Sequence, residues 1–515
     1  MPAADRIRLS PWLAVALIVI ATVLLRIHLL PTPLERDEGE YAYSGQLMLQ
    51  GIPPYQLATN MKLPGTYAAY ALAMAIFGQS TVAVHLGLLL VNAASILLIF
   101  VLGRRLYSPI AGVSAAGAYA MLSLGAGVLG TQAHATHFVV VFALAGLVML
   151  LGPTVGTPLP YGRGSEGADF HLFAAGIFFG LAFLMKQHGI FFGIFGGAWL
   201  VATRQWKKLP AFAAGAATPF ALTCVLLWRF GVFAKFWFWT VTYARHYVSE
   251  TSIGEGAAAL WQTLSPILWE SAGLWILAAA GLAWALTRKQ LFSPALLLFS
   301  FAATCPGLYF RAHYMVLILP AIALLAGSCV RGRRTAALLT LALVAALFTQ
   351  REYLFRMTPT EVARSLYGAD PFPEAIPVAA YIRQHSPPSA RIAVLASEPE
   401  IYFYARRHSA TSYLYTEPLV EPQPFALTMQ NDMVREIEQA APLYVVRFPI
   451  QETLSLAPNA PTRLFDWWAG YGPQHYQLVG IADILDGAPS EYHWEAAAET
   501  YKPQSLYHLE LYRRK

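Results

Sequence analysis

Residues 82–105, VAVHLGLLLVNAASILLIFVLGRR, form a predominantly apolar run that ends in two arginines. A helix rises about 1.5 Å per residue, so about 20 apolar residues cross the roughly 30 Å hydrocarbon core of a bilayer. The whole chain agrees with this run, because 57% of its 515 residues are hydrophobic and only 12% are charged. An ordinary soluble domain carries about twice that share of charge. The sequence therefore predicts a polytopic α-helical membrane protein.

Several apolar runs have the length of a membrane span, or nearly so. They are Pro11–Leu30, Val82–Gly103, Pro109–Gly130, His137–Pro153, His171–Met185, Gly189–Thr203, Leu209–Arg229, Leu264–Thr287, Leu291–Phe310, Ala312–Val330 and Thr335–Thr349. Residues 1–350 are thus predicted to hold about eleven transmembrane helices. The first run lacks a small-residue cleavage site, so it is predicted to be a retained helix. The two short runs around Lys186-Gln187-His188 could instead form a re-entrant pair.

Basic residues predict which side of the membrane each connection faces. Alternate connections carry Arg6, Arg8, Arg104, Arg105, Arg163, Arg204, Lys207, Lys208, Arg288, Lys289, Arg331, Arg333 and Arg334. The positive-inside rule puts these residues and the N-terminus in the cytoplasm, and an odd number of spans then leaves the C-terminus outside. This orientation explains the net charge of +6, and no nucleic-acid partner is expected.

Two outer connections, 31–81 and 230–263, are too long to be simple turns, and functional residues concentrate in such segments. Residues 351–515 have the composition of a soluble domain, with Pro371, Pro373 and Pro377 predicting a linker near its start. Strand-like runs at Arg391–Ala396, Leu443–Phe448, Tyr476–Gly480 and Leu506–Tyr512 alternate with helical segments such as Ala426–Ala440. This pattern predicts a C-terminal soluble α/β domain outside the membrane.

The first outer connection begins with the acidic stretch Leu34-Glu35-Arg36-Asp37-Glu38-Gly39-Glu40-Tyr41. Carboxylates at a membrane face are costly unless they have a function. Asp37 and Glu40 have the spacing of a capping box, which predicts the start of a helix along the membrane surface. The same place suits a general base that meets a polar acceptor, so the structural and catalytic roles both stay open.

Cationic and other polar residues recur at the predicted outer ends of the spans. Lys62, in Asn60-Met61-Lys62-Leu63-Pro64-Gly65, either reaches lipid headgroups or holds an anionic phosphate. The others are His134, His137, Lys186, Gln187, His188, Lys235, Arg245, His246, Tyr247, Arg311, His313 and Tyr314. Basic residues are disfavoured on this side, so their recurrence predicts a phosphate-binding cavity.

The architecture and the first loop together resemble the bacterial protein mannosyltransferase and aminoarabinose transferase superfamily, whose members are GT-C glycosyltransferases. The resemblance covers most of the chain. Its motifs are Asp37-Glu38 followed by Tyr41, Lys62-Leu63-Pro64, Gly180 to Lys186, and His313-Tyr314 with Leu319-Pro320-Ala321. It implies a GT-C fold in the bacterial cytoplasmic (inner) membrane with a periplasmic C-terminal domain.

The resemblance also implies a reaction. A sugar would pass from a polyprenyl-phosphate donor to a lipid, glycan or protein acceptor at the outer membrane face, with inversion at the anomeric carbon. Asp37 would be the base, Glu38 would order the first loop or orient the acceptor, and Lys62 would contact the donor phosphate. The other candidate substrate-binding residues are Tyr41, Lys186, His188, Arg245, His246, Arg311, His313 and Tyr314.

We expect no cofactor and no metal ion in this reaction, because cationic side chains can neutralise the leaving phosphate. Asp37, Glu38 and nearby histidines could bind a divalent ion incidentally. Cys224, Cys305 and Cys329 lie in apolar runs without metal-ligand spacing, so neither a disulfide nor a zinc site is expected.

The alternative from another functional class is a polytopic lipid or sugar transporter or flippase. Inverted repeats would favour it, and the sequence shows none. A scaffold or receptor would need neither so many spans nor cations on the outer side. Residues 465–472, FDWWAGYG, are similar to the WWDYG signature of oligosaccharyltransferases, but alanine replaces its aspartate and one residue is extra. This stretch is therefore predicted to pack within the soluble domain.

Overall fold

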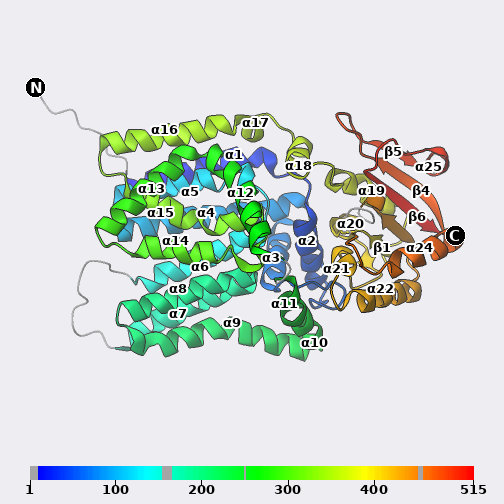
Figure 1. Cartoon of the computed structure of the whole chain (residues 1–515), viewed down its shortest axis with the longest axis horizontal. Coiled ribbons are helices and arrows are strands. Elements are labelled where there is room, and N and C mark those ends of the chain that lie inside the picture. Colours follow the sequence, from blue (N-terminus) through cyan, green and yellow to red (C-terminus); the bar gives the residue numbers. More distant parts are fainter. Residues whose placement is uncertain (1–9, 153–164, 249–250, 451–455) are drawn as a thin grey trace, which may run out of the picture.

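The computed structural model describes residues 10–152, 165–248, 251–450 and 456–515. A helical bundle forms most of the chain, and a smaller domain with a sheet covers one end of it (Figure 1). Each predicted span contains a helix of this bundle. These helices are α1 (Pro11–Arg26), α4 (Thr81–Leu106), α5 (Pro109–Leu122), α6 (Ala135–Leu150), α7 (Ser165–Met185), α8 (Ile190–Ala202), α9 (Leu209–Arg229), α13 (Ala272–Thr287), α14 (Phe292–Ala302), α15 (Leu319–Ser328) and α16 (Arg333–Thr349).

Few of these helices are long enough to cross a bilayer alone. In the described part of the chain, the segments Pro11–Leu29, Thr81–Leu106 and Trp206–Arg229 have both the length and the apolar character of a span. Helix α12 (Ile253–Glu270) qualifies only together with α13, to which it is bent by 101°. Most of the others are shorter apolar helices, so the number of about eleven spans stays a prediction.

Several helices are short because they end early on one side of the bundle. Helix α5 ends at Leu122, although the sequence predicts a span to Gly130, and α15 begins at Leu319 rather than Ala312. Short 3₁₀ segments at Ala126–Val128, Pro306–Leu308 and Ala312–Leu317 take the place of the missing turns. Non-helical backbone at membrane depth is tolerated where it is buried in protein or lines a cavity, and these segments adjoin the cavity described below.

The two long outer connections are largely helical. The first contains α2 (Arg36–Leu49) and α3 (Gly65–Phe77), and the second contains α10 (Phe233–Trp237), a π-helical turn (Phe238–Tyr243), α11 (Ala244–Tyr247) and α12. A capping box does start α2, but Glu35 and Glu38 form it. The predicted pair of Asp37 and Glu40 is wrong, because both residues already lie inside the helix. The backbone N–H of Glu38 donates to Glu35 Oε1 at 2.9 Å.

The C-terminal domain is built on a six-stranded sheet in the order β2-β1-β3-β6-β4-β5. The strands are β1 (Arg391–Leu395), β2 (His408–Ser409), β3 (Tyr444–Arg447), β4 (Tyr476–Asp483), β5 (Glu491–Trp494) and β6 (His508–Arg514). Strand β1 is parallel to β2 and β3, and the other pairs are antiparallel. All four predicted strands are confirmed. The sequence analysis missed β2, which has only two residues, and β5, which lies at the edge and is largely polar.

The part of the chain that contains this sheet also contains helices, the first of which contacts α1 and α16 of the bundle. The helices in this part are α17 (Arg351–Phe355), α18 (Pro359–Tyr367), α19 (Phe372–Gln384), α20 (Glu400–Ala405), α21 (Glu417–Val420), α22 (Ala426–Ala440), α24 (Arg463–His475) and α25 (Ala496–Thr500). Helix α22 is confirmed as predicted. The predicted proline linker is wrong, because Pro373 and Pro377 lie within α19. Trp467 and Trp468 of α24 are buried in the domain core, which confirms that this stretch packs inside the domain.

The C-terminal domain packs directly on α2. Gly39 lies so close to α20 that an added Cβ would stand 2.6 Å from the backbone nitrogen of Glu400. Arg36 donates from Nε to the carbonyl of Ser397 at 2.7 Å, and its guanidinium also pairs with Glu398 and Glu417. The backbone N–H of Ser409 donates to the Tyr43 hydroxyl at 2.7 Å. The first turns of α2 are therefore held between the bundle and the outer domain.

We expect Gly39→Ala to loosen this contact, because the new methyl group meets backbone that cannot move aside. The overpacking should destabilise the protein by about 1–3 kcal/mol. Thermal unfolding in detergent, with limited proteolysis of the C-terminal domain, measures the effect. Gly470→Ala is the matched control, because nothing lies within 4 Å of its added Cβ. Equal thermal stability of the two variants would contradict the close contact.

Candidate active site

A cavity of about 1000 Å³ lies between the bundle and the C-terminal domain. Most of the candidate residues line it, although they come from distant parts of the chain. These lining residues are Asp37, Tyr41, Lys62, Lys186, His188, Arg311, His313 and Tyr314. The structure thus brings the first loop, the end of α7 and the segment before α15 into one place.

Three of the candidate residues do not line the cavity. The Glu38 side chain is fully buried behind it, where Oε1 accepts from the backbone N–H of Ala133 at 2.5 Å and lies 2.9 Å from His85 Nε2. Arg245 and His246 lie on α11, whose Ala244 and Tyr247 face the cavity instead. The His246 ring packs against Phe425 with 5.5 Å between centroids. These three side chains therefore do not lie where a ligand in the cavity would contact them.

The Lys62 ammonium is shared between two carboxylates of α2. Its Nζ lies 2.5 Å from Asp37 Oδ1 and 2.8 Å from Glu40 Oε2. It also stands over the rings of Tyr41 and Tyr415, at 4.8 Å and 5.4 Å from their centroids. Spacing along the sequence did not reveal this arrangement, because Lys62 reaches back across a turn to a helix that begins 26 residues before it.

Asp37 is the carboxylate of this pair that reaches the cavity, since its side chain is 23% exposed whereas that of Glu40 is 1% exposed. Burial alone would raise the pKa of Asp37. The nearby Lys62, with His134 and Lys186, instead holds that pKa well below its usual range. The two carboxylates in turn hold the pKa of Lys62 above its ordinary value despite its burial. The pair is therefore an ion pair at neutral pH.

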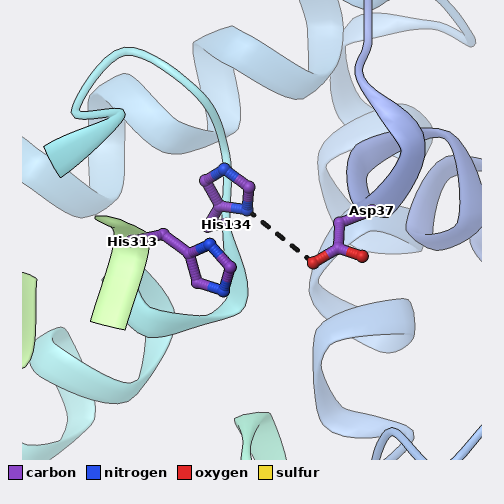
Figure 2. A group of neighbouring side chains, drawn as sticks. All are labelled: Asp37, His134 and His313. Atoms are coloured by element: carbon purple, nitrogen blue, oxygen red, sulfur yellow. Dashed lines mark ion pairs between the residues drawn. The ribbon is translucent and has the colours of Figure 1, made fainter. Parts of the chain in front are cut away.

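Two histidines complete the wall opposite Asp37 (Figure 2). His134 and His313 stack with 4.2 Å between ring centroids and an interplanar angle of 13°. His134 Nδ1 lies 4.0 Å from Asp37 Oδ2. Burial lowers the pKa of His134 to about 4, although Asp37 and Glu38 oppose the shift. A neutral His134 ring can hydrogen-bond to a ligand without adding charge, and neither of its nitrogens has a hydrogen-bond partner among the described residues.

Asp37, His134 and His313 are also the residues that could hold a metal ion, because one ligand atom from each lies within 4.8 Å of the others. One carboxylate and two imidazoles suit a transition metal such as zinc. Two ammonium groups already occupy the surroundings, since Lys62 contacts Asp37 and Lys186 Nζ lies 3.3 Å from His313 Nε2. A divalent ion would have to displace at least one of them.

Lys186 and Arg311 line the cavity without forming an ion pair in the described part of the chain. Among the described residues, neither has a carboxylate within 4.0 Å. Lys186 lies over the Tyr314 ring at 4.3 Å, and Arg311 lies over the Tyr309 ring at 5.6 Å. Burial lowers the pKa of Lys186 to about 7, although Asp37 opposes the shift. An anion that enters the cavity would meet these two side chains.

The sequence analysis missed the outer wall of the cavity. Asp370, Tyr415, Glu417 and Glu421 of the C-terminal part of the chain line it, together with Tyr243 of the second outer connection. No local motif marks these residues, because they reach the site only through the docking of one domain on the other.

We expect Lys186 to titrate near pH 7. Because its folded pKa is lowered, the amine should be largely neutral and reactive above pH 7 and charged below it. The rate of reductive methylation of Lys186 between pH 5.5 and 9.5, followed by mass spectrometry, measures this. Exposed Lys502 is the reference. A midpoint for Lys186 that coincides with that of Lys502 would contradict the effect of burial.

Part of the sequence and the fold as a whole are similar to known proteins. Residues 62–228 match the family of dolichyl-phosphate-mannose-protein mannosyltransferases. The structure is similar to that of ArnT from Cupriavidus metallidurans bound to undecaprenyl phosphate, with a TM-score of 0.60 and 15% identity over 87% of this chain and 95% of that chain. No curated protein matches the sequence.

Two further structures share the fold. The archaeal oligosaccharyltransferase AglB from Archaeoglobus fulgidus, in complex with an inhibitory peptide and a dolichol-phosphate, has a TM-score of 0.55 and 13% identity over 96% of this chain and 75% of that chain. The arabinofuranosyltransferase AftD from Mycobacteria has a TM-score of 0.54 and 14% identity over 97% of this chain and 39% of that chain.

These structural similarities establish the fold, and the family match covers Lys62 and the helices from α3 to α9. Both kinds of comparison point to glycosyltransferases, and neither supports the transporter alternative. Residues 62–228 therefore match the mannosyltransferase family, and the chain shares its fold with ArnT, AglB and AftD.

Proposed function

We propose that the protein transfers a sugar from a polyprenyl-phosphate donor to a lipid, glycan or protein acceptor at the outer face of the bacterial cytoplasmic membrane. The observation that carries this proposal is that one cavity contains a carboxylate, Asp37, and two cations, Lys186 and Arg311. Neither cation has a carboxylate within ion-pair distance among the described residues. A base and an anion site in one cavity are what transfer from a lipid phosphate requires. The undecaprenyl phosphate in the similar ArnT structure supports a lipid phosphate as the leaving group.

The membrane arrangement is part of the same proposal. The chain would span the bilayer about eleven times, with the N-terminus in the cytoplasm and residues 351–515 in the periplasm. The donor would reach the cavity from the outer leaflet, and its lipid tail would stay beside the apolar helices. The proposed partners are the donor, the acceptor and membrane lipids. Cationic side chains, in place of a metal ion, neutralise the leaving phosphate.

The proposed reaction is a single displacement. The acceptor oxygen attacks the anomeric carbon from the face opposite the phosphate while its proton passes to Asp37. The bond between the anomeric carbon and the phosphate oxygen breaks, and its electron pair leaves with the phosphate. Lys62, Lys186 and Arg311 stabilise the added charge, and the anomeric configuration inverts. The neutral His134 ring faces the second oxygen of Asp37 and orients it.

The buried Glu38 has a positioning role in this scheme. It ties the start of α2 to Ala133 and His85, which fixes Asp37 one residue earlier. Tyr41 and Tyr314 support the two lysines through their ring faces. His188 and His313 line the same cavity beside Lys186, where each can contact the donor.

Asp37→Asn should abolish transfer while the protein still folds, because asparagine keeps the size of the side chain and removes the base. We expect a loss of at least about 100-fold in kcat. The measurement is transfer of labelled sugar from a panel of polyprenyl-phosphate sugars to membrane extracts. Asp432→Asn, in the C-terminal domain, is the matched control. Near-normal transfer by Asp37→Asn would rule out the base assignment.

Lys62→Ala should weaken donor binding and change the pH profile. Asp37 would then face the donor phosphate, with the buried Glu40 behind it, and neither carboxylate would have its cation, so KM for the donor should rise about tenfold or more. The pKa of Asp37 should also rise when Lys62 is absent, so the acid limb of kcat/KM should move to higher pH. Lys502→Ala is the control for a lost surface charge. An unchanged donor dependence would count against the phosphate role of Lys62.

A further inference from the structure

Glu40 is a buried carboxylate beside the site that the proposed reaction does not use. Its Oε2 accepts from Lys62 Nζ and from Asn60 Nδ2, each at 2.8 Å, and its Oε1 accepts from the Tyr67 hydroxyl. It does not line the cavity and is 1% exposed. Glu40 therefore cannot touch a substrate, but it touches the cation that Asp37 depends on.

The backbone around Lys62 is fixed on the same side. The Tyr55 hydroxyl donates to the carbonyl of Lys62 at 2.7 Å, and the Gln187 side chain donates to the carbonyl of Met61 at 2.7 Å. Tyr55 is itself fully buried. The Lys62 side chain is thus fixed at its backbone and held at its ammonium by the buried Glu40, whereas Asp37, its other carboxylate partner, lines the cavity.

We propose that Glu40 is a positioning residue that partly neutralises the Lys62 ammonium. Lys62 is therefore not paired with Asp37 alone, and it binds the leaving phosphate less tightly. This inference rests on the proposed function. In the resting enzyme, Asp37 and Glu40 share one cation. When the acceptor proton neutralises Asp37, Glu40 remains as the counter-ion of Lys62. The fixed negative charge of Glu40 also weakens the hold on the product lipid phosphate, which must leave before the next turnover.

The test is Glu40→Gln, which keeps the size of the side chain and removes its charge. Two measurements separate the proposal from a structural role: binding of farnesyl phosphate by calorimetry, and the split between kcat and donor KM. We expect farnesyl phosphate to bind about tenfold more tightly, because Lys62 no longer shares its charge with Glu40 and attracts the anion more strongly. We expect kcat to fall about tenfold, since Asp37 then holds Lys62 alone and product leaves slowly. A merely structural defect would lower the active fraction without tightening this binding.

A double-mutant cycle shows whether Glu40 acts through Lys62. In a Lys62→Met background, Glu40→Gln should change farnesyl phosphate affinity far less than in the wild type. An equal change in both backgrounds would indicate simple charge repulsion and overturn the positioning role. Unchanged or weaker farnesyl phosphate binding by folded Glu40→Gln would also overturn it.

If Glu40→Gln does not fold, Glu40→Asp provides the second test. It keeps the charge but draws the carboxylate away from Lys62 by about one bond length, so the same changes should appear at smaller size. Unaltered affinity and kcat in folded Glu40→Asp would overturn the inference. Wild-type transfer that needs Asp37, combined with such negative results, leaves the proposed function intact. Absence of transfer from every donor by folded wild-type protein would overturn the proposed function itself.

Discussion

Four carboxylates lie at the start of α2, where burial makes an unpaired charge costly, and each of them has a partner. Glu35 accepts from the helix backbone, and Glu38 accepts from Ala133 and faces His85. Asp37 and Glu40 share Lys62. Asp37 is the most exposed of the four carboxylates, because the other three are buried with their partners. The position of the proposed base thus follows from the burial and pairing of the other three carboxylates.

The same helix start joins the two domains. Arg36 lines the cavity and pairs with Glu398, Glu417 and Asp370 of the C-terminal part of the chain. One guanidinium cannot neutralise three carboxylates, and burial raises the pKa of Glu398 to about 7 although Arg36 opposes the shift. Glu417 and Asp370 therefore add negative charge to the lining of the cavity that Lys186 and Arg311 also line. A ligand with one anionic end would meet both signs of charge in this lining.

Sequence patterns predicted the presence of helices and strands more accurately than the residues at which they begin and end. Apolar runs located every helix of the bundle, and alternation located four strands, because both patterns are local. The helix ends near the cavity were missed, since leucine and alanine in a 3₁₀ segment are as apolar as in a helix. The capping box was misplaced by two residues because the stretch Glu35 to Glu40 offers more than one acidic pair at the required spacing.

The candidate site shows where local patterns stop being informative. The positive-inside rule selected Lys62, Lys186, Arg311 and His313, because it disfavours such residues on the predicted outer side, and all four line the cavity. The same criterion also selected Arg245 and His246, which do not line the cavity, because it cannot tell which face of α11 meets the cavity. It could not find Glu417 or Tyr415, whose place depends on domain docking. Lys62 is the instructive case, because its charge was evident while its engagement by two carboxylates was not. A cation that is already shared can release one partner at little electrostatic cost when a phosphate arrives, so the apparent saturation of Lys62 is compatible with a role in binding the donor.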